Sequence, residues 1–311
     1  MNLENNQDIS RSLTKNSLRR SPTSGRTLFG FLMTGLTFLA AALALLPLVA
    51  VLSYVLFKGL ARLSWSALTE LPPAALQQGG GFGNALFGTI IMVGIGALIS
   101  IPVGIMAAVY LSEFSAETKL AQWLRFATNV LSGVPSIIVG VFGYGVAVLG
   151  LRKLGIDVSF SAIAGGFALS VLMLPIIVRA TEESLKLIPQ EIRQASLGLG
   201  ATKFQTVFRV ILPAALPAIM TGITLAIARA AGETAPLLFT AQFSQYYTPF
   251  TEKGLSALFE PTASLAVLVY NFATRPYPNQ QELAWAASLI LVLLVLLTSV
   301  ASRIATSRRV Y

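Results

Sequence analysis

Residues 189–213, PQEIRQASLGLGATKFQTVFRVILP, form a polar, glycine-punctuated stretch between two strongly apolar runs. Pro189 favours the first position of a helix, and Gly198 and Gly200 favour its end. Thr202 is suited to cap a second helix. The stretch therefore predicts two short helices joined by a turn, set between two membrane-spanning segments.

Both predicted helices carry an apolar stripe. The first stripe consists of Ile192, Ala195 and Leu199, and the second of Phe204, Val207, Phe208 and Ile211. These spacings place each set on one helical face. A helix–turn–helix on a membrane surface with an outward apolar stripe is typical of a docking element for a partner protein. An ordinary interfacial loop is the alternative.

The composition is that of an integral membrane protein. The mean hydropathy is +0.73, with 55% hydrophobic and only 11% charged residues, whereas soluble chains carry about 25% charged residues. The sequence has no cysteine and no histidine, which excludes disulfides, Cys/His metal sites and catalysis by either residue. The net charge of +9 is explained by lipid headgroups and loop topology, so no nucleic-acid partner is expected.

Six apolar runs are long enough to cross the hydrocarbon layer, which takes about 20 helical residues. They lie near 28–57, 85–111, 127–150, 160–180, 211–240 and 284–304. The predicted fold is an all-α integral membrane protein, a bundle of six spanning helices.

The distribution of Lys and Arg predicts the orientation. With the N-terminus inside, 15 Lys and Arg residues face the cytoplasm and six face outward, with Arg229 counted on neither side. Cytoplasmic loops are enriched in these residues. Both termini are therefore expected in the cytoplasm, together with the 189–213 stretch.

The remaining segments follow from this topology. We expect a disordered basic cytoplasmic tail (1–26), a first span with its outer connection (27–84), a core (85–304) and a cytoplasmic C-terminus (305–311). Within the core, the outer loop 242–283 is rich in Tyr, Phe and Pro. A loop this long is usually functional: it would cap a pore or receive a binding protein outside the membrane. Aromatic packing at headgroup level is the alternative.

Arg229 and Glu233 are charged residues within the fifth apolar run. Inserting a charge at the bilayer centre costs about 2.5–3.5 kcal/mol, so such groups normally face a cavity or a partner. Four residues apart, the two share a helical face. Either they neutralise each other and lock the bundle, or they line a translocation path, where guanidinium matches tetrahedral oxyanions.

Arg179 ends the fourth predicted span and either faces the pore or extends to the inner headgroups. The sequence contains no nucleotide-binding P-loop, no paired catalytic carboxylates and no serine nucleophile with a base. The chain is therefore not expected to be an enzyme or to hydrolyse ATP itself.

Several motifs resemble the PstA-type permease subunit of bacterial phosphate ABC importers. The 189–213 stretch is similar to the EAA loop of ABC importer permeases, with Gln194-Ala195-Ser196, Gly200 and Val210–Pro213 at the family's spacing. The other matches are 84–89 (NALFGT), 131–137 (LSGVPSI), 174–179 (LPIIVR) and 228–241 (ARAAGETAPLLFTA). The resemblance covers roughly residues 83–303.

The resemblance implies a multi-pass protein of the bacterial cytoplasmic (inner) membrane that translocates phosphate. Its implied partners are a PstC-like permease, a PstB-like ATPase dimer that binds ATP and magnesium, and a phosphate-binding protein outside the membrane. No cofactor is expected in this chain. The implied ATPase-coupling residues are Gln194, Ala195, Ser196, Gly200 and Ala201. The implied substrate path comprises Arg229, Glu233, Thr234 and Arg179.

Other functions remain open at this point. A permease for sulfate or molybdate would share the architecture, although the 228–241 stretch favours phosphate. A secondary transporter or channel independent of ATP would need its own ion relay, and a single Arg/Glu pair provides few groups to form one. A membrane scaffold is the third alternative.

Overall fold

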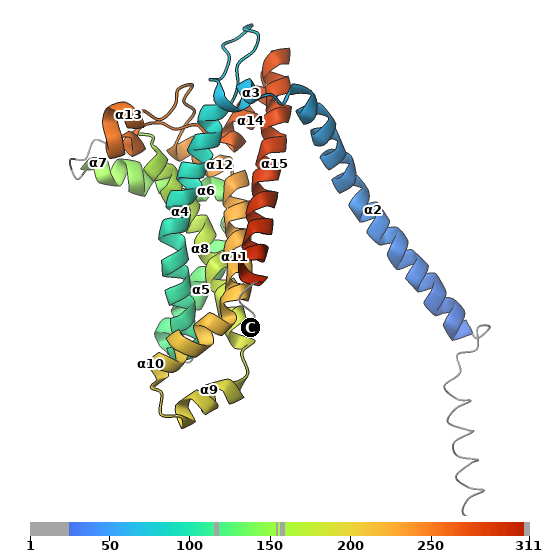
Figure 1. The fold of residues 1–311 in the computed structure, drawn as a ribbon, viewed down its shortest axis with the longest axis vertical. Helices are drawn as coiled ribbons and strands as arrows, with labels where there is room; N and C mark the ends of the chain where they lie inside the picture. The colour runs from blue at the N-terminus through green and yellow to red at the C-terminus, as the bar shows by residue number, and fades with distance from the viewer. Residues whose placement is uncertain (1–24, 115–117, 154, 156–158, 308–311) are drawn as a thin grey trace, which may run out of the picture. The chain divides into compact units, whose positions relative to one another are not determined.

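The computed structural model describes residues 25–114, 118–153, 155 and 159–307, and the regular elements in these ranges are all helical (Figure 1). Residues 1–24 of the predicted tail and 308–311 of the predicted C-terminus lie outside this part. The chain divides into two compact units, 1–54 and 55–311. The first unit contains most of α2 (Gly25–Arg62), an apolar helix long enough to cross a membrane.

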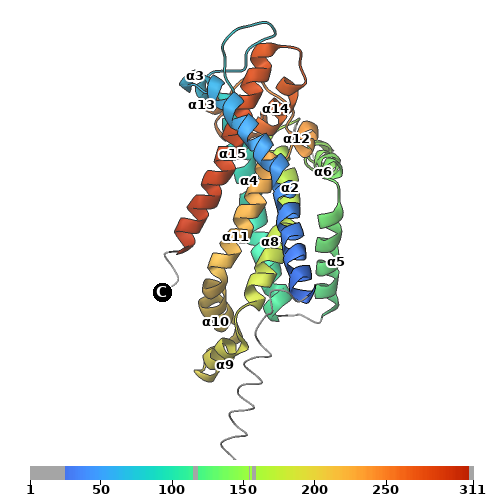
Figure 2. The same ribbon diagram turned by 90° about the vertical axis from the view of Figure 1, so that its right-hand side faces the viewer.

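The second unit is built around three long helices, α4 (Gly83–Val109), α8 (Ala162–Lys186) and α11 (Leu212–Gly232), with α15 (Pro278–Ser307) packed against α11 (Figures 1 and 2). The most apolar window of α8 is 67% buried, against 28% for α4 and α15, so α8 is the central helix. Small residues permit the close packing. A Cβ on Gly222 of α11 would lie 2.2 Å from Ala180 Cβ of α8.

Five of the six predicted spans correspond to single helical runs. These runs are Gly25–Arg62, Gly83–Phe114, Ala162–Lys186, Lys203–Gly232 and Pro278–Ile304. The all-helical, multi-span fold predicted from the sequence is thus confirmed. The last run begins six residues earlier than hydropathy indicates, because its first turn is polar.

The third predicted span, 127–150, is not a straight helix. It consists of α5 (Lys119–Gly133) and α6 (Ser136–Gly143), the latter continuing to Gly150, and the two are bent by 109°. Pro135 lacks a backbone N–H and forces the preceding residue out of the helical region. Val134 accordingly has an extended ψ of 129°. Hydropathy alone does not detect such a bend.

The fifth predicted span also differs from a continuous helix. It was expected to run to residue 240, but α11 ends at Gly232 and Glu233 is extended, with φ −73° and ψ 130°. The chain then begins the short helix α12 (Ala235–Thr240). This helix packs closely on α6, since a Cβ on Gly140 would lie 2.7 Å from Pro236 Cα.

The segment 242–283, predicted as an outer loop, is partly helical. It contains α13 (Phe250–Lys253), a 3-10 turn (Gly254–Phe259) and α14 (Leu265–Ala273). Five residues of α14 are buried (Leu265, Ala266, Val267, Leu268, Phe272). The amide of Leu265 donates to Thr89 Oγ1 of α4 at 2.8 Å. This part of the predicted loop therefore belongs to the packed core.

The other short helices are α3 (Trp65–Thr69), α7 (Leu151–Lys153), α9 (Gln190–Gly198) and α10 (Lys203–Thr206). In Figure 1, α9 and α10 lie at one end of the bundle, whereas α3, α7, α12 and α13 lie at the opposite end. We call the first the α9 end. The hydroxyl of Tyr247, at the opposite end, donates to Thr69 O at 2.7 Å, and burial raises the pKa of this phenol.

Candidate functional site

The Arg229–Glu233 pair lies where α11 breaks. Arg229 is in the last turn of α11, and its Nε donates to Glu233 Oε1 at 3.3 Å. The Glu233 side chain is 16% exposed, whereas that of Arg229 is 52% exposed. Among the described residues, the two terminal nitrogens of this guanidinium have no hydrogen-bond or ion-pair partner. The carboxylate thus orients the guanidinium while its donor fork stays open.

Thr234 follows directly and begins α12. Its side chain makes no capping hydrogen bond to that helix, and the residue is half-buried. The hydroxyl oxygen of an N-cap threonine normally accepts a hydrogen bond from a backbone N–H of the first turn. The hydroxyl of Thr234 is therefore not used by the helix that follows it and lies next in the chain to Glu233.

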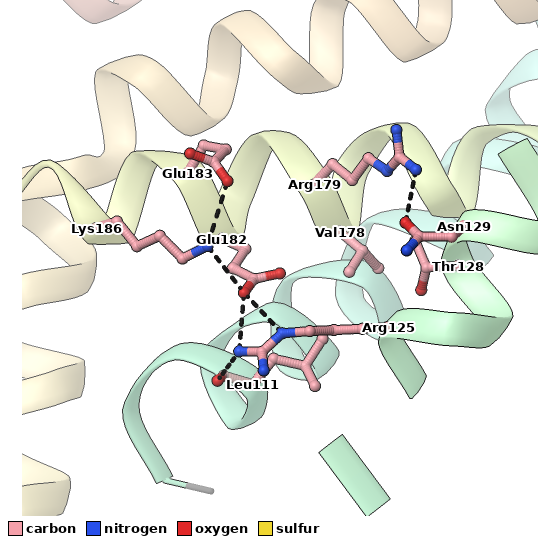
Figure 3. Close-up of a pocket in the computed structure, with 9 residues that line it drawn as sticks. All are labelled: Leu111, Arg125, Thr128, Asn129, Val178, Arg179, Glu182, Glu183 and Lys186. Atoms are coloured by element: carbon pink, nitrogen blue, oxygen red, sulfur yellow. Dashed lines mark hydrogen bonds and ion pairs between the residues drawn. The ribbon is translucent and has the colours of Figure 1, made fainter. Parts of the chain in front are cut away.

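Arg179 lies in a different place from the one predicted. The fourth helix does not end near residue 180 but continues to Lys186, so Arg179 lies about two turns inside it. Its Nη2 donates to Asn129 Oδ1 of α5 at 2.6 Å, and the side chain is exposed (Figure 3). Both residues line a cavity of about 320 Å³ between α5 and α8.

The floor of this cavity is an ion-pair cluster centred on Glu182, whose side chain is 10% exposed (Figure 3). Arg125 of α5 donates to Glu182 Oε1 from Nε at 3.1 Å and from Nη2 at 3.0 Å. Lys186 Nζ lies 3.1 Å from the same oxygen. Arg125 also donates to the carbonyl of Leu111, past the end of α4. The cluster thus joins α5 and α8 to the turn that follows α4. Arg179, which lines the same cavity, has no carboxylate partner among the described residues.

Arg179 and Arg229 are not brought together. Ala180 packs against Gly222, so Arg179 lies at about the level of Gly222 along α11. Arg229 is seven residues farther, about 10 Å along the helix axis. The predicted path residues therefore form two groups at different depths: Arg229, Glu233 and Thr234 at the end opposite α9, and Arg179 nearer the α9 end.

The predicted helix–turn–helix of residues 189–213 is present. The first helix, α9, begins after Pro189, which is its N-cap rather than its first residue, and it ends at Gly198. Gly200 has φ +87°, a conformation that L side chains rarely adopt. Thr202 caps α10 in a reciprocal pair: Gln205 N donates to Thr202 Oγ1 at 3.2 Å, and Thr202 N donates to Gln205 Oε1 at 3.0 Å.

The two predicted stripes have different outcomes. Ile192, Ala195 and Leu199 are all exposed, as a docking face requires. The second stripe splits: Val207 and Ile211 are buried, whereas Phe204 and Phe208 are exposed with their rings 4.4 Å apart. The reason is a π-helical turn over Val207–Ile211, which widens the spiral so that the four residues no longer share one face.

The coupling residues predicted from the EAA pattern lie in and after α9. Gln194 is exposed, and Ala201 donates its amide to Ser196 O at 3.2 Å. Ser196 is buried, and its hydroxyl lies 2.9 Å from that of Thr206, which is also buried. This buried side-chain bond joins α9 to α10. The sequence did not indicate it, although Ser196 occupies the position of the pattern's second alanine.

Ser196→Ala is expected to loosen the turn without unfolding the bundle. A buried hydrogen bond contributes about 0.5–1.5 kcal/mol. The loss is moderated because Thr206 can donate to a carbonyl of its own helix. Hydrogen exchange of the amides in 196–206 should become severalfold faster, while exchange in α8 stays unchanged. Unchanged exchange in the turn would show that this bond does not hold it.

Comparison with known proteins places the chain in a family. Residues 100–310 match the family described as the binding-protein-dependent transport system inner membrane component. The chain belongs to this family. It is therefore a multi-pass inner membrane protein, a permease component of an ABC transporter rather than a catalytic subunit.

Individual relatives agree with this assignment and place the permease among PstA-type proteins. It is 37% identical to the phosphate transport system permease protein PstA of Haemophilus influenzae, over 88% of this chain and 92% of that protein. It is 39% identical to the PstA of Xylella fastidiosa strain 9a5c, over 79% of this chain and 81% of that protein.

A solved structure supports the fold. The permease resembles a chain of a bacterial alginate ABC transporter in complex with an alginate pentasaccharide-bound periplasmic protein. The TM-score is 0.64 at 14% identity, covering 93% of this chain and 98% of that one. The family's permeases associate with an ATPase, which binds the ATP, and with a binding protein.

Proposed function

We propose that the permease carries inorganic phosphate across the bacterial cytoplasmic membrane along a path marked by Arg229. The observation that carries this proposal is the open guanidinium held by Glu233 at the break in α11. A planar fork of N–H donors fits a tetrahedral oxyanion in bidentate geometry. The chain is a permease subunit of a phosphate ABC transporter, in keeping with its PstA relatives.

The second step of the path is Arg179. An anion released from Arg229 would next meet this exposed guanidinium, which Asn129 orients at 2.6 Å. The 10 Å between the two levels is about two helical turns. Two sites of modest affinity in series allow an anion to leave as readily as it enters, whereas a single site of high affinity would retain it.

The proposed coupling surface is the exposed face of α9 with the turn that follows. Ile192, Ala195 and Leu199 present apolar area there, and Leu199 is 90% exposed. Gln194, Gly200 and Ala201 flank it. An ATPase that binds this face would move α9 when it closes around ATP, and α8 and α11 would then open the path alternately to each side.

The proposed assembly is heteromeric. It comprises this chain, a PstC-like permease, two copies of a PstB-like ATPase and a phosphate-binding protein outside the membrane. The α9 end would face the cytoplasm together with both termini, because Lys and Arg residues are concentrated on that side. In this topology the tail 1–26 lies in the cytoplasm and the core 85–304 spans the membrane. Within the core, the segment 242–283 lies on the outer side.

The test is uptake of labelled phosphate and sulfate by phosphate-starved cells that lack other phosphate carriers, with this chain present or deleted. Loss of phosphate uptake alone on deletion supports the proposal. Survival of phosphate uptake would exclude phosphate as the substrate, and loss of sulfate or molybdate uptake instead would identify another oxyanion. Copurification with an ATPase separates an importer from a secondary transporter or a scaffold.

Glu233→Gln is expected to reduce discrimination between phosphate and sulfate. Near neutral pH phosphate still carries a proton and can donate it to the Glu233 carboxylate, whereas fully ionised sulfate has no proton to donate. A hydrogen bond to a charged group contributes about 1.5–3 kcal/mol, so the selectivity should fall about tenfold or more. Competition of sulfate with labelled phosphate measures it. Unchanged uptake and unchanged selectivity would contradict this role.

A further inference from the structure

A nearly buried ion pair joins α9 to the end of α4. Beyond α4 the chain forms a π-helical turn, Tyr110–Phe114, which carries Glu113. Arg193 of α9 binds this carboxylate with both sides of its fork, Nη2 to Oε1 at 2.8 Å and Nε to Oε2 at 3.3 Å. The Glu113 side chain is 7% exposed and the Arg193 side chain is 14% exposed. Single π turns inserted in helices are frequently found at functional sites.

The same guanidinium also binds the end of α8. Arg193 Nη2 donates to Leu185 O at 2.9 Å, and Nη1 donates to Ile188 O. The last carbonyls of a helix lack partners within the helix, and a cation there also interacts favourably with the helix dipole. One side chain of α9 therefore contacts the ends of α8, the central helix, and of α4, which packs against it.

Without this contact the connection between α8 and α9 would be a hinge. Only Leu187, Ile188 and Pro189 separate the two helices, and Pro189 is extended, with ψ 147°. A few residues between two helices readily absorb a rotation. On the other side of α9, the buried contact is the Ser196–Thr206 bond, which leads toward α10 and α11. Movement of α9 thus reaches α4 through the Arg193 fork.

We infer that Glu113 and Arg193 form a positioning pair that makes α9 and the adjoining ends of α4 and α8 move as one body. This inference rests on the proposed function, in which an ATPase moves α9. Among the described residues, neither member of the pair hydrogen-bonds to a side chain of the proposed anion path or of the exposed stripe of α9. Its loss is therefore expected to uncouple ATP hydrolysis from transport while the ATPase stays bound.

The first test uses the complete complex reconstituted in liposomes, with Glu113→Gln. Glutamine keeps the size of the side chain and one acceptor oxygen but loses the charge that makes the bond strong. Substitution of a residue between two sites changes their coupling by about 2- to 30-fold, and the amount of anion transported per ATP hydrolysed should fall within this range. Glu282→Gln is the matched control, since Glu282 forms an ion pair with Arg62 at 3.8 Å but its own side chain is 64% exposed.

A rescue experiment separates transmission from a local structural role. The chain contains no cysteine, so Glu113→Cys with Arg193→Cys introduces its only two thiols, to be combined with cysteine-free partner subunits. The double variant is expected to be uncoupled, and a short bifunctional thiol reagent that bridges the two positions should restore most of the transport per ATP. A reagent that modifies each thiol without bridging is the control.

Three results would overturn the inference: an unchanged ratio in Glu113→Gln, loss of the ATPase from that variant's complex, or no recovery on bridging. The ratio is measured for whichever of phosphate and sulfate the unaltered complex transports. An error in the substrate would then show in the unaltered complex and would not be mistaken for failure of the positioning pair.

Discussion

Arg229→Gln is expected to lower phosphate uptake by about 10- to 100-fold, because each charge-assisted hydrogen bond contributes about 1.5–3 kcal/mol. The side chain is 52% exposed, and its only hydrogen bond or ion pair among the described residues is the 3.3 Å bond from Nε to Glu233. Glutamine can still donate hydrogen bonds but offers no charge and no fork. Initial rates of labelled phosphate uptake, with membrane levels of the assembled complex measured alongside, give the size of the effect.

Two further variants show what the charge does. Arg229→Lys keeps the positive charge but loses the planar fork, so it should fall between wild type and Arg229→Gln. Arg152→Gln removes an exposed cation of α7 and should leave uptake unchanged. Equal uptake by wild type and Arg229→Gln would exclude Arg229 from the path.

The double variant Arg229→Gln with Glu233→Gln distinguishes a role in the anion path from that of a purely structural ion pair. If the two residues merely neutralise each other, Arg229→Gln fails because it leaves a largely covered carboxylate without its cation, and removing that charge too should restore function. If the guanidinium binds phosphate, the double variant stays as impaired as Arg229→Gln. We expect this second result, since an exposed guanidinium contributes little to holding the helices together.

Local signals predicted the helix–turn–helix of residues 189–213. The Thr202 cap, the turn at Gly200 and the exposed stripe of α9 each depend on residues a few positions apart, and such short-range chemistry can be read from sequence. The spans were also predictable, since hydropathy over about 20 residues reflects the thickness of the bilayer.

What could not be predicted depends on contacts between distant residues or on irregular backbone. Glu113 and Arg193 are 80 positions apart, and neither stands out within its own segment. The π-helical turn at Val207–Ile211 divided a stripe that an ideal helix would have kept on one face. A hydropathy profile carries no information about the direction of the backbone, so it missed the 109° bend at Pro135 and the break in α11 at Glu233.

Gly200→Val is expected to abolish most ATPase binding, whereas Gly200→Asn should retain it. A Cβ at residue 200 would meet no atom within 4 Å, so the cost of substitution within this chain comes from the backbone. With φ +87°, a β-branched residue is strained by about 1–3 kcal/mol, whereas asparagine tolerates positive φ. Valine should therefore move the turn and displace the exposed face of α9.

Copurification of the ATPase with each variant, at equal levels of permease in the membrane, measures the difference, which we expect to be roughly tenfold or more. Full retention by Gly200→Val would show that the shape of this turn does not determine docking. Equal loss in both variants would mean that a side chain at 200 collides with the ATPase itself. Only a loss confined to valine ties docking to the left-handed backbone of the turn, and hence to the orientation of α9 that the Arg193 fork holds against α4 and α8.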